Sequence, residues 1–200
     1  MMAGTRRQGP GTGKRSRGKP APEPPGPALQ LTSRSPAETE ALGERLGRCL
    51  AGGEVIALTG PLGAGKTVFV RGLARALGCP PGAVASPTYV LERVYPGSLA
   101  LRHLDAYRLS GAGEFEAADL AAELSAPGSV AVLEWADRVA GALPADRLEV
   151  GFEVLGAAAR RLGFSAGSER CRRLLDRLAA GENRQGQGRG GQGAHGRPAE

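Results

Sequence analysis

A glycine-rich segment with a single lysine is the stretch of this sequence best suited to chemistry. Gly60 to Thr67 reads Gly-Pro-Leu-Gly-Ala-Gly-Lys-Thr and fits the phosphate-binding pattern G-x-x-x-x-G-K-[ST] at every fixed position. The backbone of such a loop wraps phosphate, Lys66 reaches the β and γ phosphates, and the Thr67 hydroxyl binds magnesium. The motif therefore predicts an ATPase that binds ATP and Mg²⁺.

Two acidic residues at the ends of expected strands are the candidate partners of this loop. Asp105 follows the alternating segment Leu99–Leu104, and Glu134 follows the apolar run Ser129–Leu133. Parallel strands bring their carboxyl ends to one edge of a sheet, so either carboxylate can reach a metal at the loop. The residues alone leave open which of the two carboxylates faces magnesium.

The elements around the loop follow from local signals. Glu54–Thr59 predicts a buried strand, and Val68–Leu77 predicts a helix that ends at Gly78. A strand, a glycine loop and a helix start in this order aim backbone N–H groups and the positive helix end at one point, which favours an anion.

A helix is expected before the loop strand. Ser35, Pro36 and Glu38 supply an N-cap, a first-turn proline and a capping glutamate, and Gly52-Gly53 is the expected end. We interpret this helix as an amphipathic cover for the sheet. Its start is also a candidate neighbour of the nucleotide base.

Strands and a final helix complete the expected fold. Pro96-Gly97 joins two arms of a hairpin, and Arg147–Val154 with Arg160–Ser165 predicts an antiparallel hairpin at the sheet edge. Ser168–Ala180 predicts a closing helix that Gly181 ends. The inner face of that helix consists of Cys171, Leu174, Leu175 and Leu178. The alternation of strands and helices indicates an α/β fold.

The positive charge of the chain is concentrated in its ends. The net charge is +6, but residues 28–180 hold 17 basic and 17 acidic side chains. We expect a disordered basic Gly/Pro-rich tail over residues 1–28, an ATPase domain over 29–180 and a disordered Gly-rich tail over 181–200. The basic N-terminal tail is expected to contact polyanions only weakly.

Targeting and cysteine signals are sparse. No apolar run approaches the roughly 18 residues that span a bilayer, so we expect a cytoplasmic protein without membrane contact, with an Arg-rich transit peptide as the alternative. Cys49, Cys79 and Cys171 stand far apart, which argues against disulfide and zinc frameworks.

The scarcity of lysine restricts the class of enzyme. Lys66 is the single lysine in residues 28–180, so an Asn-Lys-x-Asp guanine motif cannot be built. A small-molecule kinase stays open, because Asp137-Arg138 and arginines near the C-terminus could serve a lid. The alternative is a subunit in which Ser86–Tyr89, held by Pro87, orders on the γ-phosphate as a switch.

The ordered set of motifs resembles the TsaE family of bacterial tRNA threonylcarbamoyladenosine synthesis over about residues 31–165. The set comprises the phosphate loop, then Ser86-Pro87-Thr88-Tyr89, then His103-Leu-Asp105-Ala-Tyr107-Arg108-Leu109, then Leu133-Glu134-Trp135. The resemblance implies a P-loop NTPase-like three-layer fold with a mostly parallel central sheet and antiparallel edge strands. It also implies a complex with the TsaB and TsaD proteins, contact with tRNA through that complex, and weak ATP hydrolysis without the partners.

The resemblance also implies roles for individual residues. Thr67 and Glu134 would hold magnesium, Asp105 and Trp135 would line the active site, and the catalytic residues would be Lys66, Asp105 and Glu134. Ser86, Pro87 and Thr88 would form the switch. The nucleotide contacts would come from Gly60, Leu62, Gly63, Ala64, Gly65, Lys66, Thr67, Val68 and Trp135. The sequence departs from the family at Pro61, where an acidic or amide residue is usual, and at Val68, where Thr or Ser is usual.

Overall fold

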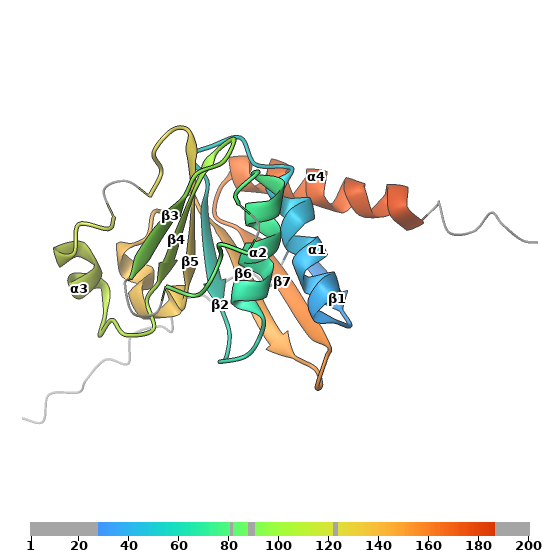
Figure 1. The fold of residues 1–200 in the computed structure, drawn as a ribbon, viewed down its shortest axis with the longest axis horizontal. Coiled ribbons are helices and arrows are strands. Elements are labelled where there is room, and N and C mark those ends of the chain that lie inside the picture. The colour runs from blue at the N-terminus through green and yellow to red at the C-terminus, as the bar shows by residue number, and fades with distance from the viewer. Residues whose placement is uncertain (1–27, 81, 88–90, 122–123, 187–200) are drawn as a thin grey trace, which may run out of the picture.

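A seven-stranded mixed sheet forms the centre of the molecule (Figure 1). The computed structural model describes residues 28–80, 82–87, 91–121 and 124–186. Our predictions for Thr88 and for the tails over 1–27 and 187–200 concern residues outside this description.

Four parallel strands occupy the middle of the sheet, in the order β6-β2-β5-β4. They are β2 (Val55–Thr59), β4 (Ala100–Asp105), β5 (Ser129–Glu134) and β6 (Leu148–Val154). The register places Asp105 opposite Glu134 at the carboxyl ends of β4 and β5. The two acidic residues therefore lie at the same edge of the sheet.

Antiparallel strands flank this centre. β3 (Glu92–Tyr95) pairs with β4, and β7 (Arg160–Ala166) pairs with β6, so both predicted hairpins are confirmed. β1 (Leu29–Ser33) lies outside β7, with Leu29 opposite Phe164. We did not predict β1, and it replaces the second arm of the C-terminal hairpin as the outer strand on that side.

Helices cover the two faces of the sheet. α1 (Pro36–Gly47), α2 (Lys66–Ala76) and α4 (Glu169–Gly186) contribute to one core. α3 (Ala112–Ala117) and the 3₁₀ segment η1 (Ala136–Ala142) contribute to the core on the opposite face. Figure 1 shows α1 and α2 side by side, and the absence of side chains at Gly43 and Gly72 allows their backbones to touch. The predicted α/β layers are confirmed.

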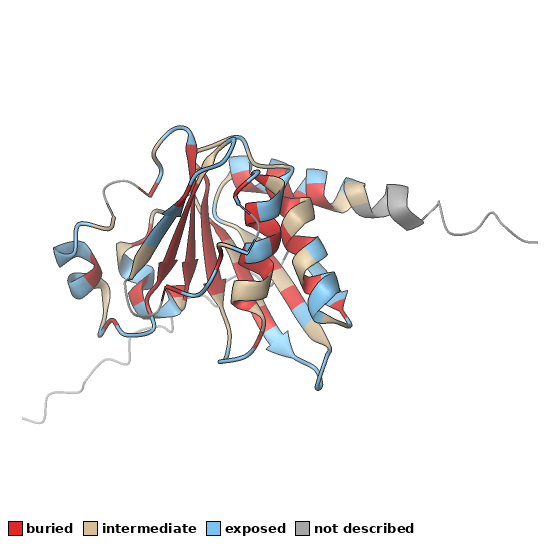
Figure 2. Ribbon diagram, in the orientation of Figure 1, coloured by how far each residue is buried: buried red, intermediate tan, exposed pale blue. Residues whose placement is uncertain are grey.

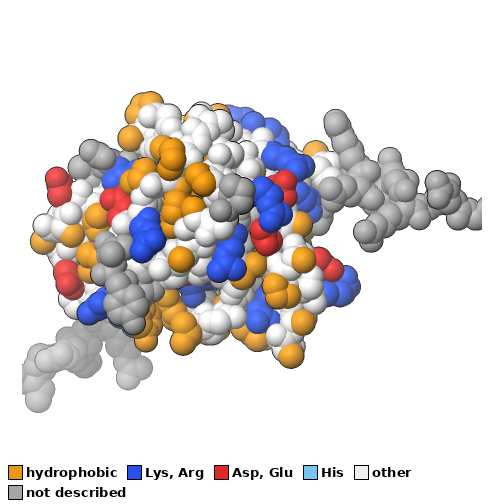
Figure 3. Space-filling view, in the orientation of Figure 1, with side chains coloured by type: hydrophobic (Ala, Val, Ile, Leu, Met, Phe, Trp, Pro, Cys, Tyr) orange, Lys and Arg blue, Asp and Glu red, His pale blue; other side chains and the backbone are white. Residues whose placement is uncertain are grey.

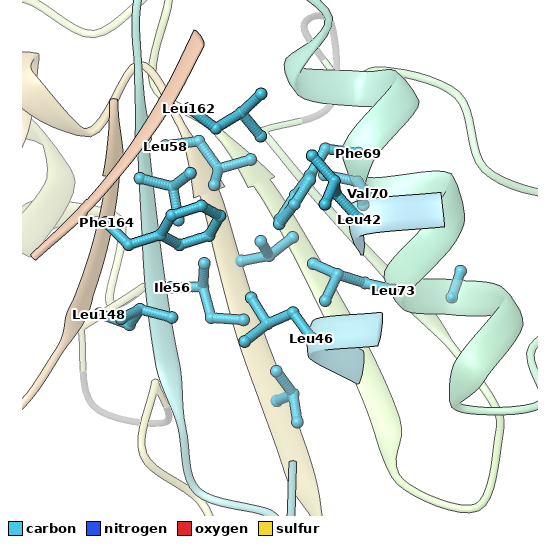
Figure 4. Close-up of a cluster of buried hydrophobic side chains, with 14 of the residues drawn as sticks. Leu42, Leu46, Ile56, Leu58, Phe69, Val70, Leu73, Leu148, Leu162 and Phe164 are labelled. Carbon is cyan, nitrogen blue, oxygen red and sulfur yellow. The ribbon is translucent and has the colours of Figure 1, made fainter. Parts of the chain in front are cut away.

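Successive side chains of β2 point to opposite faces of the sheet, so this strand contributes to both hydrophobic cores. Ile56 and Leu58 point toward α1 and α2, while Val55 and Ala57 belong to the cluster on the other face. Figure 4 shows the larger cluster, in which leucines of α1 meet Phe69, Val70 and Leu73 of α2 above the sheet. β2, β4 and β5 are buried along almost their whole length (Figure 2), as expected for parallel strands covered on both faces. β6 alternates buried and partly exposed residues and is exposed at Glu153 and Val154.

The start of α1 is confirmed, whereas its end is not where we predicted it. The Ser35 hydroxyl accepts a hydrogen bond from the Glu38 N–H at 3.1 Å, and Glu38 Oε2 accepts one from the Arg34 N–H at 2.7 Å. The helix ends at Gly47 rather than at Gly52-Gly53, because the next turn tightens: the Cys49 and Leu50 N–H groups donate to the carbonyls three residues before them, those of Leu46 and Gly47.

The end of α4 also differs from our prediction. The predicted inner-face residues Cys171, Leu174, Leu175 and Leu178 are buried. However, the helix continues through Gly181 to Gly186. Gly181 does not have the positive φ of a helix-ending glycine, so it only costs the helix about 1 kcal/mol relative to alanine.

Candidate nucleotide site

The glycine-rich loop joins the end of β2 to the start of α2, as predicted. Gly60 has a φ of +130°, and a Cβ there would lie 2.6 Å from the Phe152 carbonyl oxygen, so glycine is required for the loop to leave the strand. Gly65 caps α2 in the left-handed region with a φ of +100°. The loop therefore arrives at the positive end of a buried helix, where backbone N–H groups have no helical partner.

Lys66 lies inside the site rather than in solvent. Its side chain is buried, and Nζ donates hydrogen bonds to the carbonyl oxygens of Gly60 at 2.7 Å and Pro61 at 3.0 Å. Nζ also lies 3.8 Å from the centre of the Trp135 ring, which is a cation–π distance. The lysine is thus held in place by the loop and by the end of β5.

Burial lowers the pKa of the Lys66 ammonium from its usual value, and the negative charges of Glu134, Asp105 and Asp137 oppose that change. The direction of the shift means that removal of water outweighs the attraction of the nearby carboxylates. A site with this balance favours the entry of an additional anion close to the lysine.

One oxygen of Glu134 binds two side chains. Glu134 Oε1 accepts hydrogen bonds from the Thr67 hydroxyl at 2.8 Å and from His103 Nε2 at 2.9 Å. A carboxylate only accepts hydrogen bonds, so His103 Nε2 carries a proton in this contact. His103 is fully buried, and its Nδ1 has no hydrogen-bond partner among the described residues. The histidine therefore orients the carboxylate from behind the site.

Asp105 connects the site to the segment after α2. Its Oδ2 accepts a hydrogen bond from the Ser86 hydroxyl at 2.7 Å, and its Oδ1 accepts one from the Tyr107 N–H at 2.8 Å. The carboxylate is buried. A residue of the predicted switch thus contacts one of the two candidate acids directly.

Two aromatic rings close one side of the site. Trp135 adopts a left-handed backbone with a φ of 60°, and its ring centre lies 5.0 Å from that of Tyr107. The Arg138 guanidinium lies over the Tyr107 ring, 5.2 Å from its centre. The aromatic pair therefore forms a wall beside Lys66.

The phosphate loop, the two acidic strand ends, Ser86 and the aromatic pair surround a cavity of about 400 Å³. The predicted site residues that line it are Leu62, Gly63, Ala64, Gly65, Lys66, Thr67, Val68, Ser86, Asp105, Glu134 and Trp135. Gly60 and Pro87 are not among the lining residues. Pro87 is buried, and its carbonyl accepts a hydrogen bond from the Leu91 N–H. The structure brings the predicted residues together, and their individual roles stay predictions.

Sequence reasoning gave no role to three residues of the site region. His103 and Tyr107 belong to a motif that we used for the family resemblance, but we gave neither a role. The sequence feature that could have indicated His103 as a site residue is its position as a polar residue in a buried strand, two positions before Asp105. Arg160 contacts the loop carbonyls of Gly63 and Ala64. No local pattern indicates that contact, because it joins residues almost a hundred positions apart.

Metal ligands are few. Within the described residues, no group of three or more His, Cys, Asp and Glu side chains could hold a metal ion. The hydroxyl of Thr67 and the carboxylate of Glu134 are hard oxygen donors of the type that Mg²⁺ uses together with waters and phosphates. The donor set therefore fits magnesium better than zinc.

Comparisons with known proteins point to one family. The family model "Threonylcarbamoyl adenosine biosynthesis protein TsaE" matches residues 33–162. A tRNA threonylcarbamoyladenosine biosynthesis protein TsaE of Treponema pallidum is 40% identical over 135 residues, covering 67% of this chain and 98% of that protein. Its Bacillus subtilis counterpart is 34% identical over 157 residues, covering 78% and 96%.

A solved structure gives the same result for the fold. The crystal structure of Bacillus subtilis YdiB superposes with a TM-score of 0.63 at 29% sequence identity, covering 78% of this chain and 96% of that one. The α4 helix follows the end of the family match at residue 162. Because the family model matches more than half of this chain, the chain belongs to the TsaE family of threonylcarbamoyl adenosine biosynthesis proteins.

Proposed function

We propose that this protein binds ATP and Mg²⁺ in the cavity at the phosphate loop and hydrolyses ATP slowly. In this proposal it is a subunit of the bacterial machinery that makes tRNA threonylcarbamoyladenosine, and the TsaB and TsaD proteins transfer the threonylcarbamoyl group to the adenosine beside the anticodon. The observation that carries the proposal is the convergence of Lys66, Thr67, Asp105 and Glu134 on one cavity. Family membership supports the pathway.

The loop and Lys66 supply the phosphate contacts in this proposal. The start of α2 offers backbone N–H groups and a positive dipole end to the β-phosphate. Lys66 is buried beside the cavity and can exchange its two carbonyl contacts for phosphate oxygens. An anion would also relieve the unfavourable burial of its charge, which lowers the lysine pKa in the free protein.

Thr67 and Glu134 are the proposed magnesium ligands, because both place oxygen atoms on the cavity wall. When bound, magnesium neutralises charge on the phosphate oxygens. His103 holds Glu134 from the buried side, so the carboxylate meets the cavity in a fixed orientation. This arrangement limits the reorganisation needed when the nucleotide arrives.

Asp105 is the proposed orienter of the attacking water. Its carboxylate lies beside Glu134 in the sheet register and lines the same cavity. The Ser86 hydroxyl binds Asp105, so a movement of the segment Ser86 to Thr88 would alter the water-orienting group. We propose that this segment is the switch whose position reports the γ-phosphate to the partner proteins.

The tRNA contact is proposed to be indirect. The face of the molecule in Figure 3 carries basic and acidic side chains scattered among apolar ones. No helix in the described part of the chain has both the length and the hydropathy needed to cross a bilayer. The proposed compartment is the cytoplasm, and weak polyanion contacts are assigned to the N-terminal tail.

A small-molecule kinase is the alternative, but no contact in the described residues favours it over the subunit. Arg138, a candidate lid residue, donates a hydrogen bond to the Leu109 carbonyl and lies over Tyr107. Arg138 is exposed and does not belong to the residues that line the cavity.

An ATPase assay with and without TsaB and TsaD tests the proposal, with Lys66→Ala as the inactive control. We expect slow hydrolysis by the isolated protein and faster hydrolysis with both partners. Nucleoside analysis of tRNA from cells depleted of this chain should show a loss of threonylcarbamoyladenosine. Unchanged hydrolysis with partners together with unchanged tRNA would refute the subunit role, and phosphate transfer from ATP to a metabolite would establish the kinase instead.

A further inference from the structure

One arginine ties the phosphate loop to the hairpin between β6 and β7. Arg160 Nε donates a hydrogen bond to the Ala64 carbonyl at 3.1 Å, and its Nη2 donates one to the Gly63 carbonyl at 3.2 Å. Its Nη1 donates to the hairpin carbonyls of Gly156 at 2.8 Å and Ala159 at 2.9 Å. A guanidinium can bridge two loops in this way because its five N–H donors form a rigid planar fork.

The contact with Ala64 fixes the direction of a peptide group. In a trans peptide the carbonyl and the following N–H point in opposite directions, so a carbonyl held outward by Arg160 turns the Gly65 N–H the other way. Gly65 lines the cavity, and within the described part of the chain its N–H has no acceptor. The arginine thus occupies a carbonyl that would otherwise be available to repel phosphate, and it fixes the peptide group whose N–H, that of Gly65, can bind an anion.

Packing restrains the loop at Ala64, which is buried and whose N–H donates a hydrogen bond to the Pro61 carbonyl at 3.2 Å, but it does not restrain the two residues before Ala64. Leu62 is 81% exposed, and a Cβ built on Gly63 would meet no atom within 4 Å. Glycines in such open positions can rotate freely unless their peptide groups are bonded. The Arg160 contact with the Gly63 carbonyl therefore restrains the loop where it has little packing of its own.

We propose that Arg160 is a positioning residue for phosphate binding, which holds the Gly63–Gly65 segment in its anion-binding conformation without touching the nucleotide. The inference rests on the proposed function, since it concerns the same loop. It predicts that loss of the guanidinium weakens binding of the phosphates while the reacting groups Lys66, Thr67 and Asp105 stay in place.

The test compares Arg160→Ala with Arg161→Ala. Arg161 is the next residue of β7 and pairs with Glu153 across the same hairpin, but it has no contact with the phosphate loop. Two measurements are made on the full chain: Mg-ATP affinity by calorimetry, and hydrogen–deuterium exchange of residues 60–67 without nucleotide. We expect R160A to weaken Mg-ATP binding about tenfold and to raise exchange in the loop, and R161A to do neither.

A purely structural role for Arg160 gives a different result. In that case R160A would lower the melting temperature but leave the affinity and the loop exchange at their wild-type values well below melting, which would overturn the proposal. Equal losses in R160A and R161A would overturn it as well. If wild-type protein binds no ATP, the proposed function fails, and loop exchange still decides whether Arg160 orders the loop.

Arg160→Lys keeps the test decisive if R160A does not fold. A lysine ammonium retains the charge but is a single point of donation, so it cannot span carbonyls of both loops. We expect R160K to show a smaller loss of affinity than R160A and faster loop exchange than wild type. Wild-type affinity and wild-type exchange in R160K would overturn the proposal.

Discussion

Replacement of Glu134 separates the part that this carboxylate plays in stability from its proposed contact with magnesium. Glu134→Gln keeps the side-chain volume and one acceptor oxygen, so His103 Nε2 and Thr67 Oγ1 both retain a partner. Hydrogen bonds to charged groups contribute about 1.5–3 kcal/mol and neutral ones about 0.5–1.5 kcal/mol, so weakening two of them costs roughly 2–3 kcal/mol. Removal of a buried charge beside Asp105 offsets much of that cost. We expect the free energy of unfolding of E134Q to change by less than about 1 kcal/mol.

Glu134→Ala is expected to be more damaging to the fold. It leaves the fully buried His103 without an acceptor for its Nε2 proton, which costs about 1–3 kcal/mol. Thr67 is only partly buried, so its hydroxyl can turn to water. Urea unfolding should therefore show E134A to be less stable than wild type by about 2 kcal/mol.

The magnesium role is measured on E134Q, because that variant keeps its fold. Calorimetry should show ATP affinity reduced at least about tenfold in Mg²⁺ and unchanged in EDTA, since a metal ligand contributes only when the metal is present. Glu149→Gln is the matched control, because Glu149 lies on β6, pairs with Arg147 and is outside the cavity. An equal loss of affinity in EDTA, or no loss in Mg²⁺, would refute the assignment of Glu134 as a ligand.

Five further predictions concern the same cavity. Lys66→Ala should weaken ATP binding about a hundredfold or more in calorimetry. Its melting temperature should change little, because burial already disfavours the lysine charge. A large drop in melting temperature with retained affinity would contradict this prediction. ATP affinity should fall as pH rises through the lowered Lys66 pKa, which lies below the usual 10.5, because only the ammonium attracts phosphate. ATP titrations at several pH values between neutral pH and 10.5 measure this fall in affinity. The folding free energy changes in the opposite direction: the contribution of Lys66 to stability is greatest above pH 10.5 and is lost as pH falls through the lowered pKa. Asp105→Asn should reduce single-turnover hydrolysis about a hundredfold or more while the ATP dissociation constant stays within about twofold, and an equal loss in both would argue against a water-orienting role. Trp135 is the single tryptophan of the chain and lies over Lys66, so its fluorescence should change on ATP binding; a constant signal at saturation would contradict its placement at the site.

Local signals were sufficient for the elements that carry the site. The phosphate loop, the two acidic strand ends and the capped start of α1 each depend on residues within a few positions of one another. The positions of these features can be predicted because glycine spacing, strand ends and capping residues act over short distances. These predictions are confirmed in position by the structure.

The parts that were missed depend on contacts between distant segments. β1 is a short strand that gains its partner only from β7, and Leu29–Ser33 alone carries a weak alternating pattern. The bond from His103 to Glu134 spans 31 positions, and that from Arg160 to Gly63 spans 97. A helix end such as that of α4 also depends on packing more than on one glycine, so Gly181 was a misleading stop signal.

The position of β1 has a consequence for how the protein is made. β1 leaves the ribosome first, yet its hydrogen-bonded neighbour β7 is near the other end of the folded body. β2, which leads into the phosphate loop, likewise waits for β5 and β6. A fold with such a high contact order is expected to form slowly, and a nascent chain without the β6–β7 hairpin has neither an edge for β1 nor Arg160 for the loop. Nucleotide binding should therefore begin only after almost the whole domain has been synthesised.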